Sequence, residues 1–515
     1  MNKHSARRLV RAALLASLLV ASMAGAAFAQ EETAATLSGQ VTDSTGAVVP
    51  SATVVVTNTE TGTERRVVSN EDGLYSVSPL PPGPYQIVIE QSGFKRYVQT
   101  DVVLNAKDRR LANIVLEAGN LSEVITVTGE QTGVLDSPTT QSLISGTQVV
   151  ELPLNNRNFL KLTELVPGVS SSLDDEATFG LTSRADISIN GMRRNSVNYF
   201  VDGVSNTDVG SNITLLSTPT IDSILEFKVL ASNYTAEIGR SGGGAVTLVT
   251  KGGGNDFHGS LYEFIRNDYF NANTFFNNRL GTNPATGQPR AKTPKLRYNN
   301  FGGTISGPVY LPRFGEGGKP YWSGKNKTFF FFSQETRRII RGATEAGAST
   351  ITAAQRNGDF SALLGAPLFR ATNNTSCTTP GTGTCTTTPL LVTDTGGNSI
   401  QARAGMVFRP ADGRAYAGNI IPTSDISPLA LLFLPAFPLP NGAGNAFTAT
   451  PVNINHTRQE SIRIDHAFND NHRLFGRYTH DLSQTQESGG LFNNVAFPNI
   501  STTDTRVPGH VLAVS

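Results

Sequence analysis

The stretch SIRIDHAFNDNHRLFGRYT, residues 461–479, carries the pattern that decides the fold. Apolar or small residues occupy positions 462, 464, 468, 474, 476 and 478, and most of the positions between them are polar: Ser461, Arg463, Asp465, Arg473, Arg477 and Thr479. A period of two is that of a β-strand with two different faces. The centre of the stretch, residues 469–471, is Asn-Asp-Asn and favours a turn. The stretch therefore predicts a β-hairpin with one apolar and one polar face.

Similar strands occur elsewhere after residue 251. In residues 300–307, Phe301, Gly303, Ile305 and Gly307 alternate with Asn300, Gly302, Thr304 and Ser306. Residues 258–266 and 325–333 are predicted to form aromatic-rich strands. An apolar outer face, a small polar inner face and aromatic ends are typical of a β-barrel embedded in lipid. On this pattern alone, a soluble sandwich with one wet face remains the alternative.

The composition fits a chain built from strands and turns. Of 515 residues, 38% are hydrophobic and 16% charged, whereas soluble globular proteins carry about 25% charged residues. The chain has 50 glycines and 27 prolines, more than helical domains usually contain. Lys+Arg 42 against Asp+Glu 41 leaves a net charge of +1, without the basic excess of a nucleic-acid-binding domain. These values argue against an ordinary cytosolic enzyme and against a nucleic-acid partner.

Residues 1–29 have the pattern of a secretory signal peptide. Lys3, Arg7, Arg8 and Arg11 precede an apolar run over residues 12–23, and we expect cleavage after Ala29 in Ala-Phe-Ala. An uncleaved anchor is the alternative, but the run is well short of the ~20 residues that span a bilayer. Cleavage would remove four basic and no acidic residues, which leaves 38 Lys and Arg against 41 Asp and Glu. The net charge therefore falls from +1 to −3. Because no other stretch has 18 consecutive apolar residues, an exported chain of this kind would cross a membrane only as a closed barrel.

Residues 36–118 are predicted to form a β-sandwich. Short strands at 37–41, 53–57, 65–69, 74–77 and 85–90 are separated by turn signals at about ten-residue spacing. The phrases Asp72-Gly-Leu-Tyr75, Leu80-Pro-Pro-Gly-Pro-Tyr85 and Gly93-Phe94 closely resemble those of the carboxypeptidase regulatory-like domain. The resemblance implies a prealbumin-like, carbohydrate-binding-like sandwich that accompanies zinc carboxypeptidases without carrying their active site.

Residues 131–254 are predicted to form a small α+β unit with a short helix that ends before Pro167. The segments Ile189-Asn-Gly-Met-Arg193, Tyr199-Phe-Val-Asp-Gly203 and Ile224-Leu-Glu-Phe-Lys228 resemble the plug of a TonB-dependent outer-membrane receptor. Further phrases, such as Asn233-Tyr-Thr-Ala-Glu-Ile-Gly-Arg240 and Asp256-Phe-His-Gly-Ser260, resemble the Oar-like branch of that family. The expected fold is mainly β: a prealbumin-like sandwich, a small α+β plug and the first strands of a transmembrane antiparallel β-barrel.

The resemblance implies energy-coupled import of a large or scarce ligand across the bacterial outer membrane. The expected partners are TonB, outer-membrane lipid and an external ligand that is an iron chelate, a glycan or a peptide; no cofactor and no enzymatic activity are expected. The sandwich and plug are expected on the periplasmic side. The alternative is a glycan-binding or adhesion protein that uses the same sandwich and barrel without transport.

The barrel region, residues 255–515, is shorter than the resemblance implies. Only about six convincing strands follow the plug, whereas plugged transporter barrels have 22. We therefore expect an incomplete barrel and an N-terminal fragment. The Gly/Thr/Pro/Asn-rich segment near 343–450 is expected to be a long external loop.

The linker, residues 119–130, contains a segment that resembles a TonB box: Glu123, Val124, Ile125, Thr126, Val127 and Thr128. Such a box must be extended and β-prone so that it can add itself as a strand to TonB. The alternative is a last sandwich strand or an ordinary linker. Proline at Val124 or Ile125 is expected to abolish uptake without harming folding.

No other motif predicts chemistry. Cys377 and Cys385 are expected to form a loop disulfide in an oxidising compartment, with two idle thiols as the alternative. Gly239-Arg-Ser-Gly-Gly243 matches a nucleophile elbow but precedes a strand-like segment instead of a helix. His456, His466, His472 and His480 are expected to be polar rim residues, and Asp174, Asp175, Glu176, Asp202 and Asp208 to lie in solvated loops. No catalytic residue and no metal site are expected.

Overall fold

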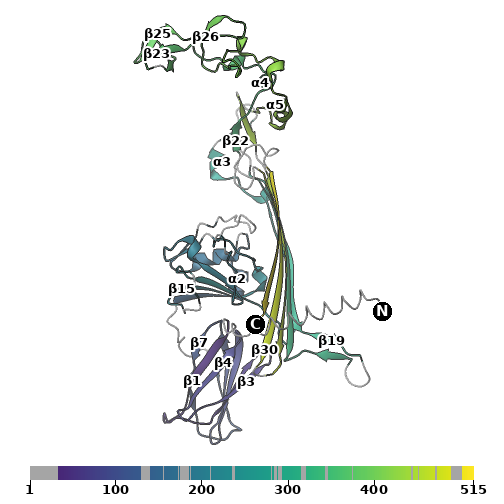
Figure 1. Ribbon diagram of the computed structural model, residues 1–515. Coiled ribbons are helices and arrows are strands. Elements are labelled where there is room, and N and C mark those ends of the chain that lie inside the picture. Colours follow the sequence, from purple (N-terminus) through teal and green to yellow (C-terminus); the bar gives the residue numbers. More distant parts are fainter. Residues whose placement is uncertain are drawn as a thin grey trace, which may run out of the picture.

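A computed structural model shows three units along the chain: a β-sandwich, an α+β unit and a long curved sheet (Figure 1). The structure describes residues 33–128, 140–488 and 502–514, apart from gaps at 155, 172, 174–184, 186, 209, 211, 235–237, 240, 280, 283–286, 288–292, 315–319, 343–345, 374, 442–444, 450–451 and 470–471. The predicted signal peptide, its cleavage site at Ala29 and the acidic run from Asp174 to Glu176 lie outside the described residues. In the described part of the chain, no helix is long and apolar enough to span a bilayer.

The sandwich consists of two sheets whose inner faces share one core. The first sheet has the order β4-β1-β7, and β8 also pairs with β1: β1 Ala35–Asp43, β4 Leu74–Leu80, β7 Arg109–Leu111, β8 Ile114–Leu116. The second has the order β3-β2-β5-β6-β9: β2 Thr53–Asn58, β3 Glu64–Val68, β5 Gly83–Glu90, β6 Arg96–Leu104, β9 Val124–Thr128. Alternate residues of β1 and β2 are buried, including Leu37, Val54 and Val56. Period-two patterning thus builds this core, as the sequence predicts.

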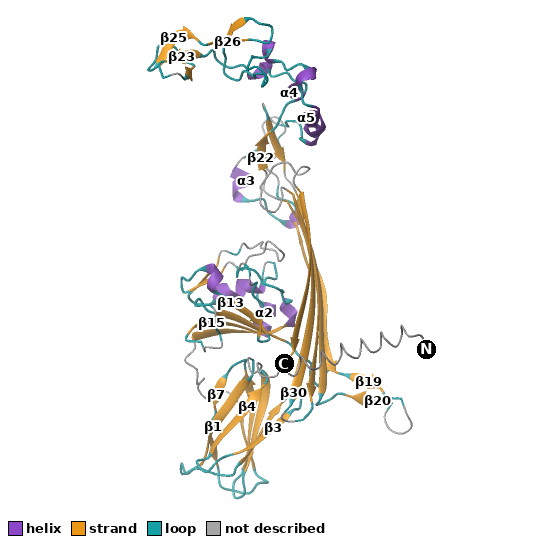
Figure 2. Cartoon of the chain, in the orientation of Figure 1, coloured by secondary structure: helices purple, strands orange, loops and turns teal. Residues whose placement is uncertain are grey.

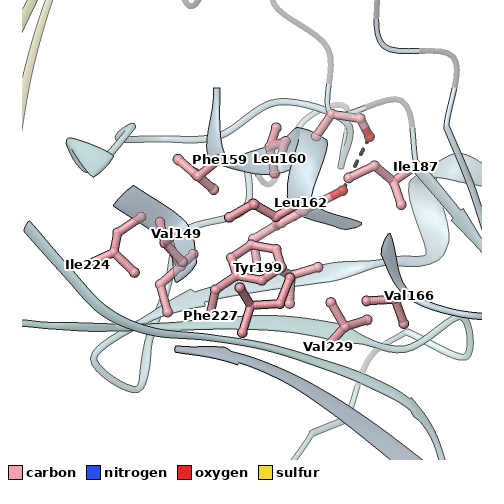
Figure 3. Packing of buried hydrophobic residues seen from close by; sticks show 14 of the residues in the cluster. Val149, Phe159, Leu160, Leu162, Val166, Ile187, Tyr199, Ile224, Phe227 and Val229 are labelled. Atoms are coloured by element: carbon pink, nitrogen blue, oxygen red, sulfur yellow. Dashed lines mark hydrogen bonds between the residues drawn. The ribbon is translucent and has the colours of Figure 1, made fainter. Parts of the chain in front are cut away.

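The α+β unit has a five-stranded sheet of order β10-β15-β16-β13-β14: β10 Thr140–Ser145, β13 Asn198–Val201, β14 Val204–Ser205, β15 Ile224–Ser232, β16 Ala245–Thr250. Its other elements are α2 Gly146–Glu151, η2 Phe159–Leu165, β11 Val169–Ser171, β12 Ile187–Ile189, η3 Arg194–Ser196 and η4 Ile221–Ser223. Figure 3 shows Val149, Phe159, Leu162, Tyr199 and Phe227 packed in its core, where each is fully buried. Helix α2 begins with a capping box between Ser145 and Gln148.

The predicted short helix before Pro167 is a 3-10 helix that ends at Leu165. Val166, the next residue, has extended backbone angles. This is the conformation that a following proline imposes.

The long sheet contains six antiparallel strands in sequence order: β17 His258–Asn267, β18 Leu296–Pro308, β21 Thr328–Gly342, β29 Val452–Ala467, β30 Arg473–Ser488, β31 Thr502–Val514. The predicted hairpin is β29–β30, in which Ile462 pairs with Tyr478. The predicted alternation is confirmed on β18, where Asn300 and Ser306 are buried and Phe301 and Ile305 are exposed. Among the described residues, β17 and β31 each have a strand partner on one side only.

The α+β unit (the plug) and the sandwich lie on the same side of the long six-stranded sheet (the wall). The sandwich lies near one end of the strands of the wall (Figure 1). At that end β18 and β21 are joined by a small hairpin, β19 Tyr310–Pro312 and β20 Tyr321–Ser323. The opposite end carries the described residues between 346 and 449, which form small elements of their own (Figure 2). The elements at that end are η5 Asp268–Phe270, α3 Phe275–Arg279, β22 Ala346–Ser349, α4 Ala353–Arg356, η6 Ser361–Leu363, β23 Phe369–Ala371, β24 Ser376–Cys377, β25 Cys385–Pro389, β26 Leu391–Thr393, β27 Ser399–Gln401, η7 Ala417–Asn419, η8 Thr423–Asp425, α5 Pro428–Phe433, η9 Leu434–Ala436 and β28 Ala446–Ala449.

Candidate functional site

The TonB-box candidate, residues 123–128, lies at the edge of the sandwich. Its strand β9 pairs in parallel with β6 from Arg96↔Val124 to Thr100↔Thr128. Among the described residues, β9 pairs with β6 alone, and its residues alternate between exposed and half-buried. In the structure this segment is therefore a last sandwich strand with one open edge.

The register shows which backbone groups face that open edge. Arg96 N–H donates to the Glu123 carbonyl at 2.9 Å. In a parallel ladder, alternate residues of one strand direct both backbone groups to the same neighbour. Glu123, Ile125 and Val127 therefore face β6, whereas Val124, Thr126 and Thr128 present N–H and C=O groups to the open edge.

The open edge is connected directly to the plug sheet. Residues 129–139, which lie outside the described part, lead to β10. Strand β10 is the edge of the plug sheet and pairs with β15 from Thr140↔Ser232 to Ser145↔Glu226. Along the covalent chain, the TonB-box candidate thus leads to the plug at the Thr140 end of β10.

A second feature is a buried cluster around Asp202, at the end of plug strand β13. The expectation that Asp202 lies in a solvated loop is therefore wrong: its carboxylate is buried because it has charged and hydrogen-bonding partners. Thr250 donates to Asp202 through its backbone N–H and its hydroxyl, both at 2.7 Å. Arg477 of the sheet wall lies with Nη1 2.6 Å from Asp202 Oδ2, and Arg463 Nη1 lies 3.8 Å from Oδ1. One plug carboxylate therefore binds two wall arginines, while Asp465 of the wall neutralises part of the charge by pairing with Arg463 at 2.8 Å.

A third feature joins η2 and η4 of the plug to strand β21. Arg157 and Asp222 form an ion pair within the plug, and Arg157 Nε lies 3.9 Å from Glu335 Oε2 of the wall. Glu335 also accepts hydrogen bonds from Arg337 Nε at 2.6 Å and from the Tyr262 hydroxyl at 2.9 Å. All the charges of this group are nearly excluded from water, so its members must stay paired.

Gly302 of β18 makes room for the Tyr262 bond. A Cβ atom at this position would lie 2.2 Å from the Gln334 carbonyl oxygen and 2.8 Å from the Tyr262 hydroxyl. Both distances are shorter than a non-bonded contact permits. Glycine at position 302 therefore allows the Tyr262–Glu335 hydrogen bond between strands β17 and β21 of the long sheet.

A cavity of about 150 Å³ lies between plug residues 214–218 and strands β21, β29, β30 and β31. Its lining includes Glu335, Arg337, Gln459 and Asp481. Gln459 Nε2 donates to the Thr218 carbonyl at 2.7 Å and also to Asp481. The plug thus meets a polar wall here, which suits a unit that can shift against the wall better than an apolar seam does.

The sandwich also binds the plug. Ala106 N–H donates to Glu226 Oε2 at 2.9 Å, and Lys228 Nζ lies 3.3 Å from Asp108 Oδ1 and donates to the Ala106 carbonyl. Burial raises the pKa of Glu226 to about 7, although the Ala106 hydrogen bond and the Lys228 charge act in the opposite direction. The sandwich–plug contact is thus a small, buried polar joint.

The remaining candidates lie apart from these contacts. Cys377 and Cys385 are joined by a disulfide, with Cα atoms 5.8 Å apart, at β24 and β25. His480 pairs with Glu460 at 3.0 Å, His466 contacts Thr328 and His472 contacts Asn469. His456 is opposite Arg338 in the ladder. Of the described residues, no group of three or more His, Cys, Asp or Glu is arranged to hold a metal ion.

The nucleophile-elbow match has no elbow around it. Ser241 lies between strands β15 and β16, and the element that follows is β16, a strand. Arg240 lies outside the described residues. Asp208, which is expected in a solvated loop, accepts hydrogen bonds from Gly210 N–H and the Thr214 hydroxyl, both at 3.0 Å.

Sequence reasoning did not identify the charged contacts of Arg157, Asp222, Glu335, Arg463 or Arg477. The available signal was the placement of Arg463 and Arg477 on the polar face of a strand whose other face is apolar. Charges on the inner face of a barrel need partners or water, so they are candidates for plug contacts. Their partners lie more than 60 residues away along the chain, beyond the reach of any periodicity.

Comparison with known proteins matches each unit in turn. The family models that match are "Carboxypeptidase regulatory-like domain" at residues 36–117, "TonB-dependent Receptor Plug Domain" at 134–246 and "Outer membrane beta barrel domain" at 249–513. The chain is 29% identical to the TonB-dependent transporter Oar of Myxococcus xanthus over 297 residues, which cover 55% of this chain and 26% of Oar. The chain thus spans about a quarter of the length of this curated relative.

Solved structures give weaker likenesses. A ferric enterobactin receptor, PfeA, from Pseudomonas aeruginosa is 12% identical, with a TM-score of 0.32 over 74% of this chain and 46% of that one. The siderophore receptor PirA from Acinetobacter baumannii is 13% identical, with a TM-score of 0.30 over 73% and 44%. Since the barrel model alone matches more than half of the chain, the protein belongs to the outer-membrane β-barrel family, and the regulatory-like and plug models that match ahead of the barrel make its order of units similar to that of an Oar-like TonB-dependent receptor.

Proposed function

We propose that this receptor imports an external ligand across the outer membrane with energy delivered by TonB through strand β9. The observation that carries the proposal is the open edge of β9, placed directly before the plug. An exposed strand edge is the site at which an added strand gains main-chain hydrogen bonds. TonB would therefore pair with the backbone groups of Val124, Thr126 and Thr128.

Transport would follow from the way the plug is fastened. A pull that reaches Thr140 opens the β10–β15 ladder from its end, so its hydrogen bonds break in succession instead of together. The plug is held to the wall by ion pairs such as Asp202–Arg477, which can exchange partners with water as the plug shifts. Opening on the polar side around Gln459 would give a hydrated path for the ligand.

The class of ligand follows from the relatives only in outline. Oar is named a transporter, and PfeA and PirA are named for siderophores. A large or scarce ligand that porins do not pass is the requirement common to such systems. The long segment 343–451 at the far end of the wall would supply recognition, because loops on a rigid scaffold usually carry it.

The test uses two proline variants that differ by one residue. Thr126→Pro removes an N–H donor on the open edge, whereas Ile125→Pro removes one that faces β6. We expect the full chain with Thr126→Pro to lose at least tenfold in affinity for the TonB C-terminal domain, and Ile125→Pro to retain binding. This sharpens the expectation from sequence, in which both positions 124 and 125 were equivalent.

Unchanged affinity of Thr126→Pro would overturn the proposal. Circular dichroism of Thr126→Pro should match the parent, because this proline lacks an N–H only on the open side of an edge strand. Ile125→Pro removes one N–H from the β6–β9 ladder, so its spectrum should differ by no more than the pairing of the five-residue strand β9. A surface-binding protein without transport needs no TonB contact, so binding that depends on Thr126 also separates import from adhesion.

A further inference from the structure

Strand β6 of the sandwich contacts both the TonB-box candidate and the plug. Its first five residues, Arg96 to Thr100, pair with β9. Directly after it ends at Leu104, the turn containing Ala106 and Asp108 binds Glu226 and Lys228 of plug strand β15. One rigid strand and its turn therefore connect the site of TonB attachment to the plug by a route that bypasses β10.

The turn is well suited to bear load. Asp108 accepts hydrogen bonds from the backbone N–H and the side chain of Asn105, both at 2.9 Å, and these fix its conformation. Ala106, Asp108, Glu226 and Lys228 are each at most 5% exposed. Separating the two units would have to break the buried Asp108–Lys228 pair and both hydrogen bonds of Ala106 together, so the joint is harder to part than a single exposed contact.

The sandwich has a further attachment at the wall. Asn255, just before β17, donates its N–H to the Glu60 carbonyl in the β2–β3 turn at 2.9 Å. Asn255 also exchanges hydrogen bonds with Asn326, just before β21, at 2.6 and 2.8 Å. The sandwich is thus held at the plug and at the wall, and it cannot simply follow a pull on β9.

We infer that the sandwich is a brake on energy transfer: while β9 stays paired with β6, the pull of TonB is borne by the sandwich and by its attachments at the wall and at β15, and it does not reach the β10 end of the plug. The inference rests on the proposed function. The pull would reach the β10 end of the plug only after β9 separates from β6, because the tension then passes along the chain to β10.

The contacts indicate that β9 is the part that yields. It is a five-residue parallel edge strand, and three of its five residues are exposed. The ion pair between Lys95 and Glu123, just before β9, has a distance of 3.4 Å, and the Glu123 side chain is 57% exposed. Exposed ion pairs contribute little to stability. The buried joint at Asp108 and Lys228 should outlast this ladder.

A cross-link between β6 and β9 tests the brake. Val98 and Thr126 are opposite one another in the register, so Val98→Cys with Thr126→Cys would lock β9 in place while keeping the open-edge N–H of residue 126. The matched control is Val55→Cys with Arg66→Cys, which locks β2 to β3 elsewhere in the sandwich. The full chain, held in a bilayer, is pulled by a TonB C-terminal domain on a force probe, with and without reductant.

We expect the oxidised Val98–Thr126 lock to bind TonB at the parent frequency and to abolish plug extension, so that the TonB contact ruptures first. Reduction should restore extension, and the control pair should extend in both states. The parent chain with reductant controls for the native Cys377–Cys385 disulfide. Extension that is unaffected by the oxidised lock would overturn the brake alone, whereas absence of TonB binding in every variant would overturn the proposed function and the brake with it.

Discussion

Arg477 of strand β30 and Asp202 of the plug form an ion pair in which Nη1 lies 2.6 Å from Oδ2, with both side chains almost fully buried. The Asp202 carboxylate also accepts hydrogen bonds from the backbone N–H and the hydroxyl of Thr250, the last residue of β16. One residue thus fixes the plug strand and fastens the plug to the wall.

Asp202→Ala should loosen the plug strongly. Removing one partner of a buried pair leaves charge uncompensated, at a cost of about 3–5 kcal/mol, and here Arg477 loses its carboxylate partner whereas Arg463 keeps Asp465. The measurement is the free energy of plug unfolding in urea. Asp412→Ala is the matched control, because its pairs with Arg409 and Arg414 lie at the surface, where they should cost about 0–1 kcal/mol. Equal effects of the two changes would contradict this account.

Gly302→Ala should weaken the contact between β18 and β21. The added methyl group meets a carbonyl oxygen of the neighbouring strand, and overpacking of this kind costs about 1–3 kcal/mol. Gly476→Ala on β30 serves as the control, because a Cβ there meets nothing within 4 Å. Thermal unfolding should separate the two variants. If Gly302→Ala is as stable as Gly476→Ala, β18 and β21 can move apart without loss of thermal stability, and the prediction is wrong.

Tyr262→Phe should remove one donor from Glu335 while leaving the ring over Arg157, whose guanidinium carbon lies 4.9 Å from the ring centre. A hydrogen bond to a charged group contributes about 1.5–3 kcal/mol. A double-mutant cycle with Glu335→Gln measures this coupling. Tyr269→Phe, at an exposed position, should be silent in the same assay. Coupling near zero would mean that Glu335 is satisfied by Arg337 alone.

The sandwich and wall could be predicted from sequence because their strands keep a strict period of two. Strand β6 escaped prediction because its alternation breaks. Asp101 adopts a positive φ of 60°, and the β5–β6 register shifts between Tyr85 and Ile87. A bulge of this kind swaps the faces of all residues beyond it, so a search for period two finds only fragments.

The contacts of the candidate site were less predictable for a different reason. The TonB-box candidate could be found because it is a local β-prone segment, but its pairing with β6 depends on a partner about 28 residues earlier. The wall arginines could be placed on the polar face, yet nothing local selects Asp202 over other acidic residues. Which charges meet is decided by how the plug docks, and periodicity carries no information about docking.

The sandwich–plug joint should be more stable in mild acid than at neutral pH. Burial raises the pKa of Glu226 from the usual 4.5 to about 7, so the docked state binds the proton more tightly than the separated state. Stability from this group is fully present below pH 4.5 and is lost as pH rises to about 7. Desolvation therefore outweighs the stronger hydrogen bond that the charged carboxylate would accept from Ala106.

The measurement is hydrogen exchange of the Ala106 amide at pH 5.5 and pH 8, corrected for the intrinsic exchange rate. Protection should fall several-fold at the higher pH. Glu226→Gln keeps an acceptor for Ala106 but cannot ionise, so its corrected protection should be the same at both values. Protection that rises with pH would mean that the charged carboxylate holds the joint and that the attraction of Lys228 exceeds the cost of burial. A pH dependence that persists in Glu226→Gln would show that Glu226 is not the group responsible.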